Sequence, residues 1–400
     1  MRAGWENKSL KDICSVYGRI GFRGYTKADF VSSPDDGAIT LSPSNIISGE
    51  LRCDKCSYVS WEKYYQSPEI MIFPGDILLV KTASIGKCAL VRSLPHEATI
   101  NPQFVVLKEI KANHQYLTYF LQSPTAQKKF QEFAIGAAVP TFSQKKLEGL
   151  IVPVPSLPEQ QRIVDILDRE FAKIDALKAN AEKSLQAAKD LFQTTLKKEL
   201  EPKEGWKTIA IGELSLKITD GSHNPPKGIA DSKYRMLSSQ NVWNGYLDKS
   251  VARYLTENDF LVEDRRTCAR EGDVLLTIVG TIGRTCVLTK EDENITFQRS
   301  VCIIKPKPEL NPFFLCYQLQ SKNEEINLQA NGAAQKGFYL KQVQRLHIQL
   351  ASLQEQAEIV SRLDNLNDRC KSLQDNYQKT LALCDNLKQS LLRKAFNGEL

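Results

Sequence analysis

The sequence repeats itself once, at a spacing of about 197 residues. Four short segments recur in the same order in the two halves, and both halves open on a Gly-Trp pair. The matching segments are residues 74–79 and 271–276, 84–87 and 281–284, 121–123 and 319–321, and 157–160 and 353–356. Solenoid repeats have periods of about 20 to 50 residues, so this long period indicates a duplicated domain with its linker.

Each copy ends in a stretch that predicts a long helix. Residues 159–201 contain no proline or glycine, and from residue 359 the apolar positions alternate spacings of four and three, as in a coiled-coil seam. At ~1.5 Å per residue each helix would extend ~60 Å. Because a whole domain separates them, we expect the helices to pair antiparallel within the chain; the alternative is that each packs only on its own domain. The expected seam comprises Ile163, Leu167, Ile174, Leu177, Leu191, Ile359, Leu363, Leu366, Leu373, Tyr377, Leu387 and Leu391.

The segments before the helices have the pattern of mixed α/β domains. Short Val-, Ile- and Leu-rich runs broken by Gly and Pro, such as residues 76–81 and 273–278, predict strands. Residues 115–133 and 312–330 have helical spacing. We therefore predict an α/β (mixed α+β) chain with a pseudo-two-fold repeat: two globular domains separated by two long antiparallel helices that form an intramolecular coiled coil. The expected segments are 1–155 (domain), 156–201 (helix), 202–350 (domain) and 351–400 (helix).

The charge is unevenly distributed along the chain. The net charge of +6 divides into 18 basic against 14 acidic residues in 1–155, 8 against 8 in 156–200, 20 against 18 in 201–350, and 7 against 7 in 351–400. The excess therefore lies on the globular segments, which is compatible with binding to nucleic acid. No run approaches the roughly 18 to 20 apolar residues of a membrane span, and the first residues lack the apolar core of a signal peptide. A soluble, cytoplasmic protein is expected.

The sequence contains no catalytic, cofactor-binding or metal site that its motifs support. Cys53 and Cys56 form one close pair with no second pair or nearby histidine to complete a zinc site. Residues 224–227 read Asn-Pro-Pro-Lys, so a lysine replaces the aromatic that would stack on a flipped adenine in an amino-methyltransferase. The Gly86-Lys87 pair lacks the spacing of a phosphate-binding loop. With four histidines and no nucleophile elbow, a non-catalytic chain is expected.

Both domains instead carry basic, amide and aromatic side chains on expected loops. Arg, Lys, Asn and Gln read base edges in the grooves of DNA, and Arg and Lys also hold phosphates. Individually each of these residues fits an ordinary solvated surface, but as a set they favour DNA binding. The candidates are Arg19, Arg23, Tyr25, Lys81, Lys87 and Lys145 in the first domain, and His223, Asn224, Lys227, Arg235, Gln240, Arg253, Arg284, Arg299 and Lys336 in the second.

Several motifs, together with the duplication, resemble the DNA specificity subunits of Type I restriction–modification systems over essentially the whole chain. They are residues 74–78 (PGDIL) with Ile85 and Gly86, 140–147 (PTFSQKKL), 153–163 (PVPSLPEQQRI), 220–226 (DGSHNPP) and 391–400 (LLRKAFNGEL). The second copy departs from the pattern at residues 331–337 and 349–351, which weakens the transfer of individual roles to the second helix entry.

This resemblance implies a DNA reader with two target-recognition domains, each reading half of a bipartite, asymmetric target. The coiled coil would set the spacer between the half-sites and bind two methyltransferase subunits, and restriction/translocase subunits would join them. S-adenosylmethionine, ATP and Mg would then belong to the partner subunits, with no cofactor in this chain. Two other interpretations stay open at this point: a coiled-coil scaffold that binds only protein, and a stand-alone DNA-modifying enzyme with an unrecognised site.

Overall fold

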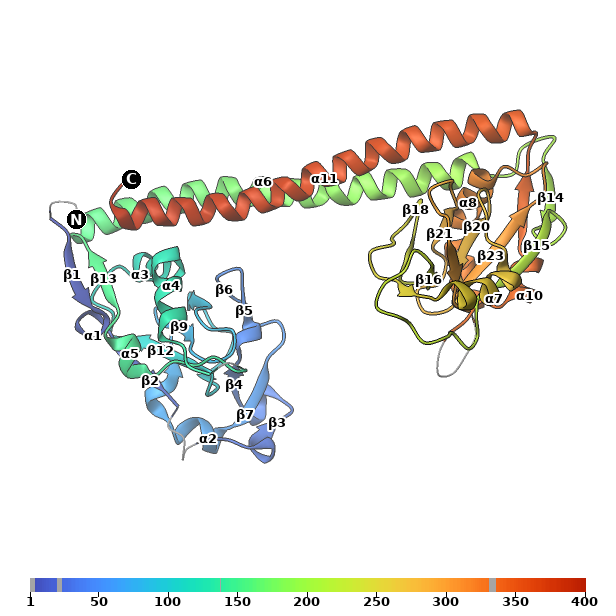
Figure 1. Cartoon of the computed structure of the whole chain (residues 1–400). Coiled ribbons are helices and arrows are strands. Elements are labelled where there is room, and N and C mark those ends of the chain that lie inside the picture. Colours follow the sequence, from blue (N-terminus) through green and yellow to red (C-terminus); the bar gives the residue numbers. More distant parts are fainter. Residues whose placement is uncertain (1–3, 20–23, 137, 331–335) are drawn as a thin grey trace. The chain divides into compact units, whose positions relative to one another are not determined.

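The computed structural model describes residues 4–19, 24–136, 138–330 and 336–400. The chain divides into two compact units, one formed by residues 1–182 with 379–400 and the other by residues 183–378. Each unit contains one globular α/β domain and parts of two long helices, α6 (Leu157–Glu199) and α11 (Leu353–Asn397) (Figure 1). None of the described helices is long and apolar enough to cross a membrane.

The first domain is built from two sheets, in the strand orders β10-β9-β12-β2 and β3-β7-β4-β11-β8, with a β1-β13 ribbon and a β5-β6 hairpin. Its strands are β1 Glu6–Ser9, β2 Ser15–Gly18, β3 Phe30–Val31, β4 Gly37–Leu41, β5 Ile46–Ile47, β6 Glu50–Leu51, β7 Ser57–Ser60, β8 Met71–Ile72, β9 Ile77–Val80, β10 Cys88–Leu90, β11 Ala98–Ile100, β12 Phe104–Lys108 and β13 Ile151–Val154. Its helices are α1 Leu10–Ile13, α2 Trp61–Tyr65, α3 His114–Gln122, α4 Pro124–Phe133 and α5 Gln144–Glu148.

The second domain repeats this plan with the orders β21-β20-β23-β15 and β19-β16-β22, a β14-β24 ribbon and a β17-β18 hairpin. Its strands are β14 Lys207–Ala210, β15 Ser215–Asp220, β16 Arg235–Leu237, β17 Val242–Trp243, β18 Tyr246–Leu247, β19 Arg253–Tyr254, β20 Val274–Thr277, β21 Thr285–Val287, β22 Ile295–Phe297, β23 Val301–Pro306 and β24 His347–Leu350. Its helices are α7 Glu257–Thr267, α8 Pro312–Ser321, α9 Asn323–Gln329 and α10 Leu340–Arg345. In each domain the second of these two sheets contains one parallel pair, β11 with β4 in the first domain and β22 with β16 in the second.

Side-chain hydrogen bonds repeat along with the strands. The buried Gln160 side chain accepts from Asn113 N (2.8 Å) and donates to Pro155 O (2.8 Å), which fixes the start of α6 on its domain. The buried Gln356 side chain does the same for α11, with Asn311 N (2.7 Å) and Ala351 O (2.9 Å). These two glutamines come from the repeated residues 157–160 and 353–356, so the motif has a structural function at the helix entry.

Each domain packs against the long helices within its own unit. In the first, Leu167 of α6 and Phe396 of α11 join a core that contains Tyr116 and Phe120 of α3. In the second, Phe192 and Leu196 of α6 and Leu363 of α11 join a core with Phe314 of α8. Burial of these large apolar side chains is the main favourable contribution to both packings.

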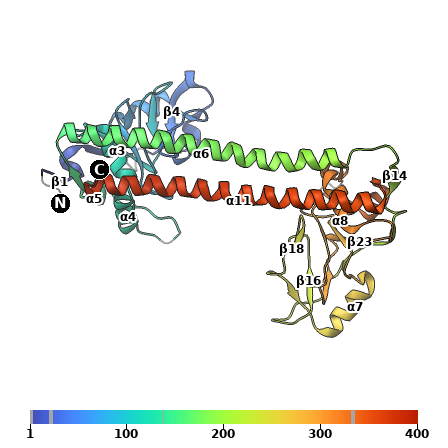
Figure 2. The ribbon, with the colours of Figure 1, turned by 90° about the horizontal axis from the view of Figure 1, so that it is seen from above.

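Ion pairs show that α6 and α11 run antiparallel in each unit. Lys178 pairs with Asp385 (2.7 Å) and Lys388 with Asp175 (2.5 Å) in the first unit. Arg362 pairs with Glu199 (2.8 Å) in the second. Residue numbers thus rise along one helix as they fall along the other, and the two ribbons lie side by side in both views (Figures 1 and 2).

The seam differs from the expected one at four positions. Leu177, Leu191, Leu373 and Leu387 are 42–51% exposed and lie outside it. Of the other expected positions, Ile163, Leu167, Ile174, Ile359 and Leu363 are buried, and Leu366, Tyr377 and Leu391 are half-buried. In the middle of the helices the buried positions carry small side chains, namely Ala181, Ala188, Cys370 and Cys384.

Candidate nucleic-acid interface

Four loops of the second domain meet at one edge of its sheets. β15 and β20 end at the edge where the antiparallel β23 begins, and the parallel strands β16 and β22 end together. The loops that follow or precede these ends are residues 221–224, 238–241, 278–284 and 298–300, which we call the loop edge of the second domain. Backbone hydrogen bonds join them, including Ser222 N to Phe297 O (2.8 Å) and Arg299 N to Ser222 O (2.9 Å). Ser239 N also donates to Ser300 Oγ (3.0 Å).

The loop edge presents several of the expected DNA-binding side chains to solvent. His223, Asn224, Gln240 and Arg299 are exposed on three of its four loops. Exposed Lys336 lies beside the fourth, because Gly337 forms a β-bridge with Val279 and Phe338 N donates to Ile278 O (2.8 Å). Five residues from four separate segments of the sequence are thereby brought to one edge, with donors of the kind that bind base edges and phosphates.

A buried carboxylate orients His223. The side chain of Asp220 is 10% exposed, and its Oδ1 accepts a hydrogen bond from Arg266. Its other oxygen, Oδ2, is 2.7 Å from Nε2 of His223. Arg266 also donates from Nε to the Asp220 carbonyl (3.0 Å). The histidine is therefore held at the start of the loop edge by the same pair that ties α7 to β15.

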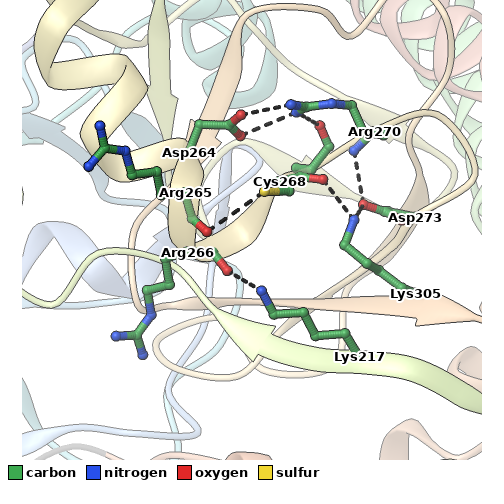
Figure 3. A network of polar contacts seen from close by, with 9 residues as sticks. Lys217, Asp264, Arg265, Arg266, Cys268, Arg270, Asp273 and Lys305 are labelled. Carbon is green, nitrogen blue, oxygen red and sulfur yellow. Dashed lines mark hydrogen bonds and ion pairs between the residues drawn. The ribbon is translucent and has the colours of Figure 1, made fainter.

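Figure 3 shows the polar network at the end of α7. Arg270 forms two hydrogen bonds to Asp264, at 2.9 and 3.3 Å, and Lys305 pairs with Asp273. Lys217 of β15 donates to the Arg266 carbonyl (2.6 Å). Arg270, Lys305 and Lys217 therefore help to hold the end of α7 on the sheet.

Three further candidates of the second domain lie on neighbouring loops and strands. Arg253 donates from Nη1 to Pro226 O (2.9 Å), which supports the loop that carries exposed Lys227. Arg235 is half-buried on β16, and its buried Nε has no hydrogen-bond partner among the described residues. Both arginines therefore belong to the framework beside the loop edge more than to its exposed surface.

The first domain has an equivalent loop edge, formed by residues 42–45, 81–87 and 101–103. Asn101 N donates to Leu41 O (3.0 Å), and Lys81 N donates to Gln103 O (2.8 Å). Lys87 is exposed, while Lys81 is half-buried and its pKa is lowered by burial. Lys145 is exposed on α5.

Arg19 is placed differently from the other candidates of the first domain. Its guanidinium is buried, donates to Ile100 O (3.2 Å) and lies 4.6 Å from the Tyr25 ring centroid, and burial lowers its pKa. The Tyr25 hydroxyl is 2.7 Å from the Thr40 hydroxyl, and burial raises the pKa of Tyr25. Both side chains are thus bound within the domain, which favours a supporting role. Arg23 lies outside the described residues.

The structure adds two aromatic residues that sequence reasoning missed. Trp243 and Tyr246 flank the turn of the β17-β18 hairpin, and the side chain of Arg284 lies over the Trp243 ring with 3.9 Å between Cζ and the centroid. The available signal was Asn244-Gly245 between aromatic residues, which is a typical hairpin turn.

Among the described residues no group of three or more His, Cys, Asp or Glu is arranged to hold a metal ion.

Duplicated α/β domains with matching loop edges, each followed by a helix of a shared antiparallel pair, define a two-domain recognition protein. The family model for the Type I restriction modification DNA specificity domain matches residues 2–187 and again 203–381. The chain belongs to this family.

Characterised relatives and solved structures agree with this membership. The EcoBI specificity subunit of Escherichia coli, a Type I restriction enzyme component, is 29% identical over 425 residues, covering 99% of this chain and 86% of that protein. The EcoKI specificity subunit of Escherichia coli strain K12 is 24% identical and covers 99% and 89%. Two solved chains share the fold: one from a structure on assembly of the type I R-M system (TM-score 0.79, 20% identity, 100% and 99% covered) and the HsdS subunit from Thermoanaerobacter tengcongensis (0.56, 19%, 100% and 98%).

Proposed function

We propose that this chain is the DNA-reading, non-catalytic subunit of a Type I restriction–modification complex. Each domain would bind one half of a bipartite target through its loop edge. The observation that carries the proposal is that the two loop edges have the same backbone frame but different side chains, since the exposed cation before β10 is Lys87 and the residue before β21 is Arg284. Two readers with different side chains recognise different half-sites, so the target is asymmetric.

The long helices would set the spacing between the half-sites. A helix has a rise of ~1.5 Å per residue and DNA ~3.4 Å per base pair, so helix length translates into a number of unread base pairs. Exposed leucines on these helices are the surface we assign to two methyltransferase subunits: Leu177 and Leu387 in the first unit, and Leu191 and Leu373 in the second. S-adenosylmethionine, ATP and Mg would bind to the methyltransferase and the restriction/translocase subunits.

The test is methylation mapping of duplex DNA by the chain assembled with its methyltransferase. We expect methylated adenines in two short, different sequences at a fixed spacing. Removing one heptad from each helix, residues 182–188 and 375–381, should shorten the spacer by about three base pairs, because seven residues span ~10.5 Å. An unchanged spacer in a complex that still assembles would show that the length of the helices does not set the spacing between the half-sites.

The same preparation separates the two other functions that the sequence left open. A protein-binding scaffold predicts that the assembled complex does not retard any duplex at low salt. A stand-alone enzyme predicts that the purified chain alone methylates or cleaves DNA. We expect retardation only in the assembled complex, because an excess of +4 and +2 on the two domains provides few phosphate contacts.

A further inference from the structure

An exposed aromatic pair stands beside the loop edge of the second domain. Trp243 is 39% exposed and Tyr246 54% exposed, although both are large aromatic side chains. Their rings are stacked, with 5° between the planes and 6.2 Å between centroids. They occupy directly opposite positions of the β17-β18 hairpin, and Gly245 provides the positive φ of +87° that the turn requires.

The hairpin tip is attached to the strand that follows Arg284. Gly245 N donates to Thr285 O (3.0 Å), and Thr285 N donates to the Asn244 side chain (3.1 Å). The backbone of Arg284 is held as well, because its N–H donates to Thr277 Oγ1 and its carbonyl accepts from Thr277 N, both at 2.9 Å. The aromatic pair and the arginine are therefore fixed relative to each other by backbone contacts on both sides.

The flat face of the Arg284 guanidinium contacts the Trp243 ring, while its N–H groups make no hydrogen bond among the described residues. Its Cζ lies 3.9 Å from the centroid of Trp243, within the range of a cation–π contact. Within the described part of the chain no hydrogen bond or ion pair to this guanidinium is found, and the residue is half-exposed. A planar group stacked on one face, with five N–H donors left for a ligand, is preorganised for a planar, two-acceptor partner.

We propose that Arg284, held in plane by the Trp243 ring, reads one guanine of the half-site bound by the second domain. Guanine presents N7 and O6 side by side in the major groove, which is the acceptor pair that an arginine fork binds bidentately. Arg284 is then the specificity-determining residue, and Trp243 is a positioning residue that acts through it. The assignment rests on the proposed function, because it places DNA at the loop edge.

The first domain shows what this position is like without the aromatic pair. Its β5-β6 hairpin has Ile47 and Glu50 at the positions of Trp243 and Tyr246, and Lys87 replaces Arg284. Glu50 is paired with Arg52 at 2.7 Å. A lysine is a rotating point charge without the fixed fork of an arginine, so Lys87 suits a phosphate contact better than a bidentate contact with a base.

The closing experiment measures binding of the assembled complex to duplexes in which each guanine of the mapped second half-site is replaced, one at a time, by 7-deazaguanine. This base lacks the N7 acceptor. With the unaltered chain we expect one position at which the replacement weakens binding by roughly 10-fold, since the loss of N7 breaks one bond of the bidentate pair. In Arg284→Ala the same replacement should have no further effect.

Variants of the aromatic pair test whether it positions the Arg284 guanidinium or only stabilises the domain. Trp243→Leu should reduce the effect of 7-deazaguanine at that one position by at least half, and Trp243→Phe should restore it, because a phenyl ring still supports the guanidinium. Phe313→Ala removes an aromatic of similar exposure (47%) at the start of α8, which follows the opposite end of β23, and should change nothing. Lys87→Ala should weaken all duplexes equally.

Each contrary result has a distinct meaning. If the unaltered complex retards no duplex, the proposed function is wrong and this assignment fails with it. If the complex binds but no guanine of the second half-site is sensitive, Arg284 contacts a phosphate and only the assignment fails. If Trp243→Leu weakens assembly with the methyltransferase and the complex that still forms keeps the full base effect, the aromatic pair is a protein-binding surface.

Discussion

The two globular domains of this chain agree in their supporting hydrogen bonds and disagree in their exposed loop residues. Gly86 N donates to Val80 O in the first domain and Gly283 N to Thr277 O in the second, both at 2.9 Å. The next residue in each loop is Lys87 or Arg284, and its carbonyl accepts the return bond from the same partner. The frame is thus made by backbone groups, which leaves the side chain between these bonds open to change.

A buried asparagine in each domain illustrates the same division. Asn241 accepts from Ser238 N (2.9 Å) and donates to Asp248 O (2.9 Å) and Val251 O (2.6 Å). Asn45 makes the matching contacts with Ser42 N, Arg52 O and Lys55 O, at 2.9 to 3.1 Å. Each asparagine closes the loop after its hairpin with three bonds to the main chain, so the loop path is independent of the exposed side chains that it carries.

The largest effect is expected when this frame is broken. Asn241→Ala removes three hydrogen bonds from a side chain that is 2% exposed and leaves two carbonyls without a donor, at a cost of about 3 kcal/mol in the free energy of unfolding. Because the domains have separate cores, hydrogen exchange should rise in residues 235–255 and stay unchanged in residues 37–60. Asn45→Ala should give the reverse pattern.

The matched control is Asn224→Ala, which alters an exposed asparagine on the loop edge and should leave exchange unchanged in both domains. Faster exchange in both domains after either buried substitution would mean that the domains are not independent readers.

A smaller effect is expected where each domain meets its helix. The Tyr317 hydroxyl donates to Asp364 of α11 at 2.6 Å, and Tyr119 makes the same contact with Asp168 of α6. Tyr317→Phe removes one hydrogen bond whose acceptor is exposed to water, so the loss should be about 1 kcal/mol. Chemical unfolding should show similar losses for Tyr317→Phe and Tyr119→Phe, whereas Tyr65→Phe, at an exposed tyrosine, should be neutral.

The sequence predicted the architecture well and the seam only in part. The duplication, the two long helices and the strand-rich domains follow from periodicity, which local residue types determine. An alternating four–three spacing, extended through the middle of the helices, predicts Leu177 and Leu387 in the seam. There Lys178 and Lys388 are only 32% and 26% exposed, and their ammonium groups pair with Asp385 and Asp175 of the facing helix. A pattern that counts lysine as polar misses its apolar stem.

The loop edges show the same limit for the candidate site. Sequence reasoning found the residue types but could not bring residues 221–224, 238–241, 278–284 and 298–300 together, because their proximity depends on sheet order. It also could not distinguish buried Arg19 from exposed Arg299, since both are arginines near glycines or strand ends. Burial is a property of the packed domain and has no local signal in these segments.

The smallest effect is expected from the ion pairs between the helices, and its pH dependence should differ between the two units. In the second unit the hydrogen bond from Arg362 holds the pKa of Glu199 below its ordinary value. A lowered carboxyl pKa stabilises the fold above the ordinary value of about 4.3, and the contribution is lost as the pH falls through the folded-state pKa. Because Arg362 is half-exposed, solvent screening limits the contribution to about 0.5 kcal/mol.

In the first unit the hydrogen bond to Asp385 raises the pKa of Lys178, so that contribution is present at neutral pH and is lost as the pH rises through the raised value. Chemical unfolding of Glu199→Gln against the unaltered chain should therefore show a difference at pH 7 that disappears in acid. The difference for Lys178→Met should persist at pH 9 and shrink only at higher pH. If Glu199→Gln were equally destabilised at pH 7 and pH 3, the Glu199 contribution would be packing rather than charge.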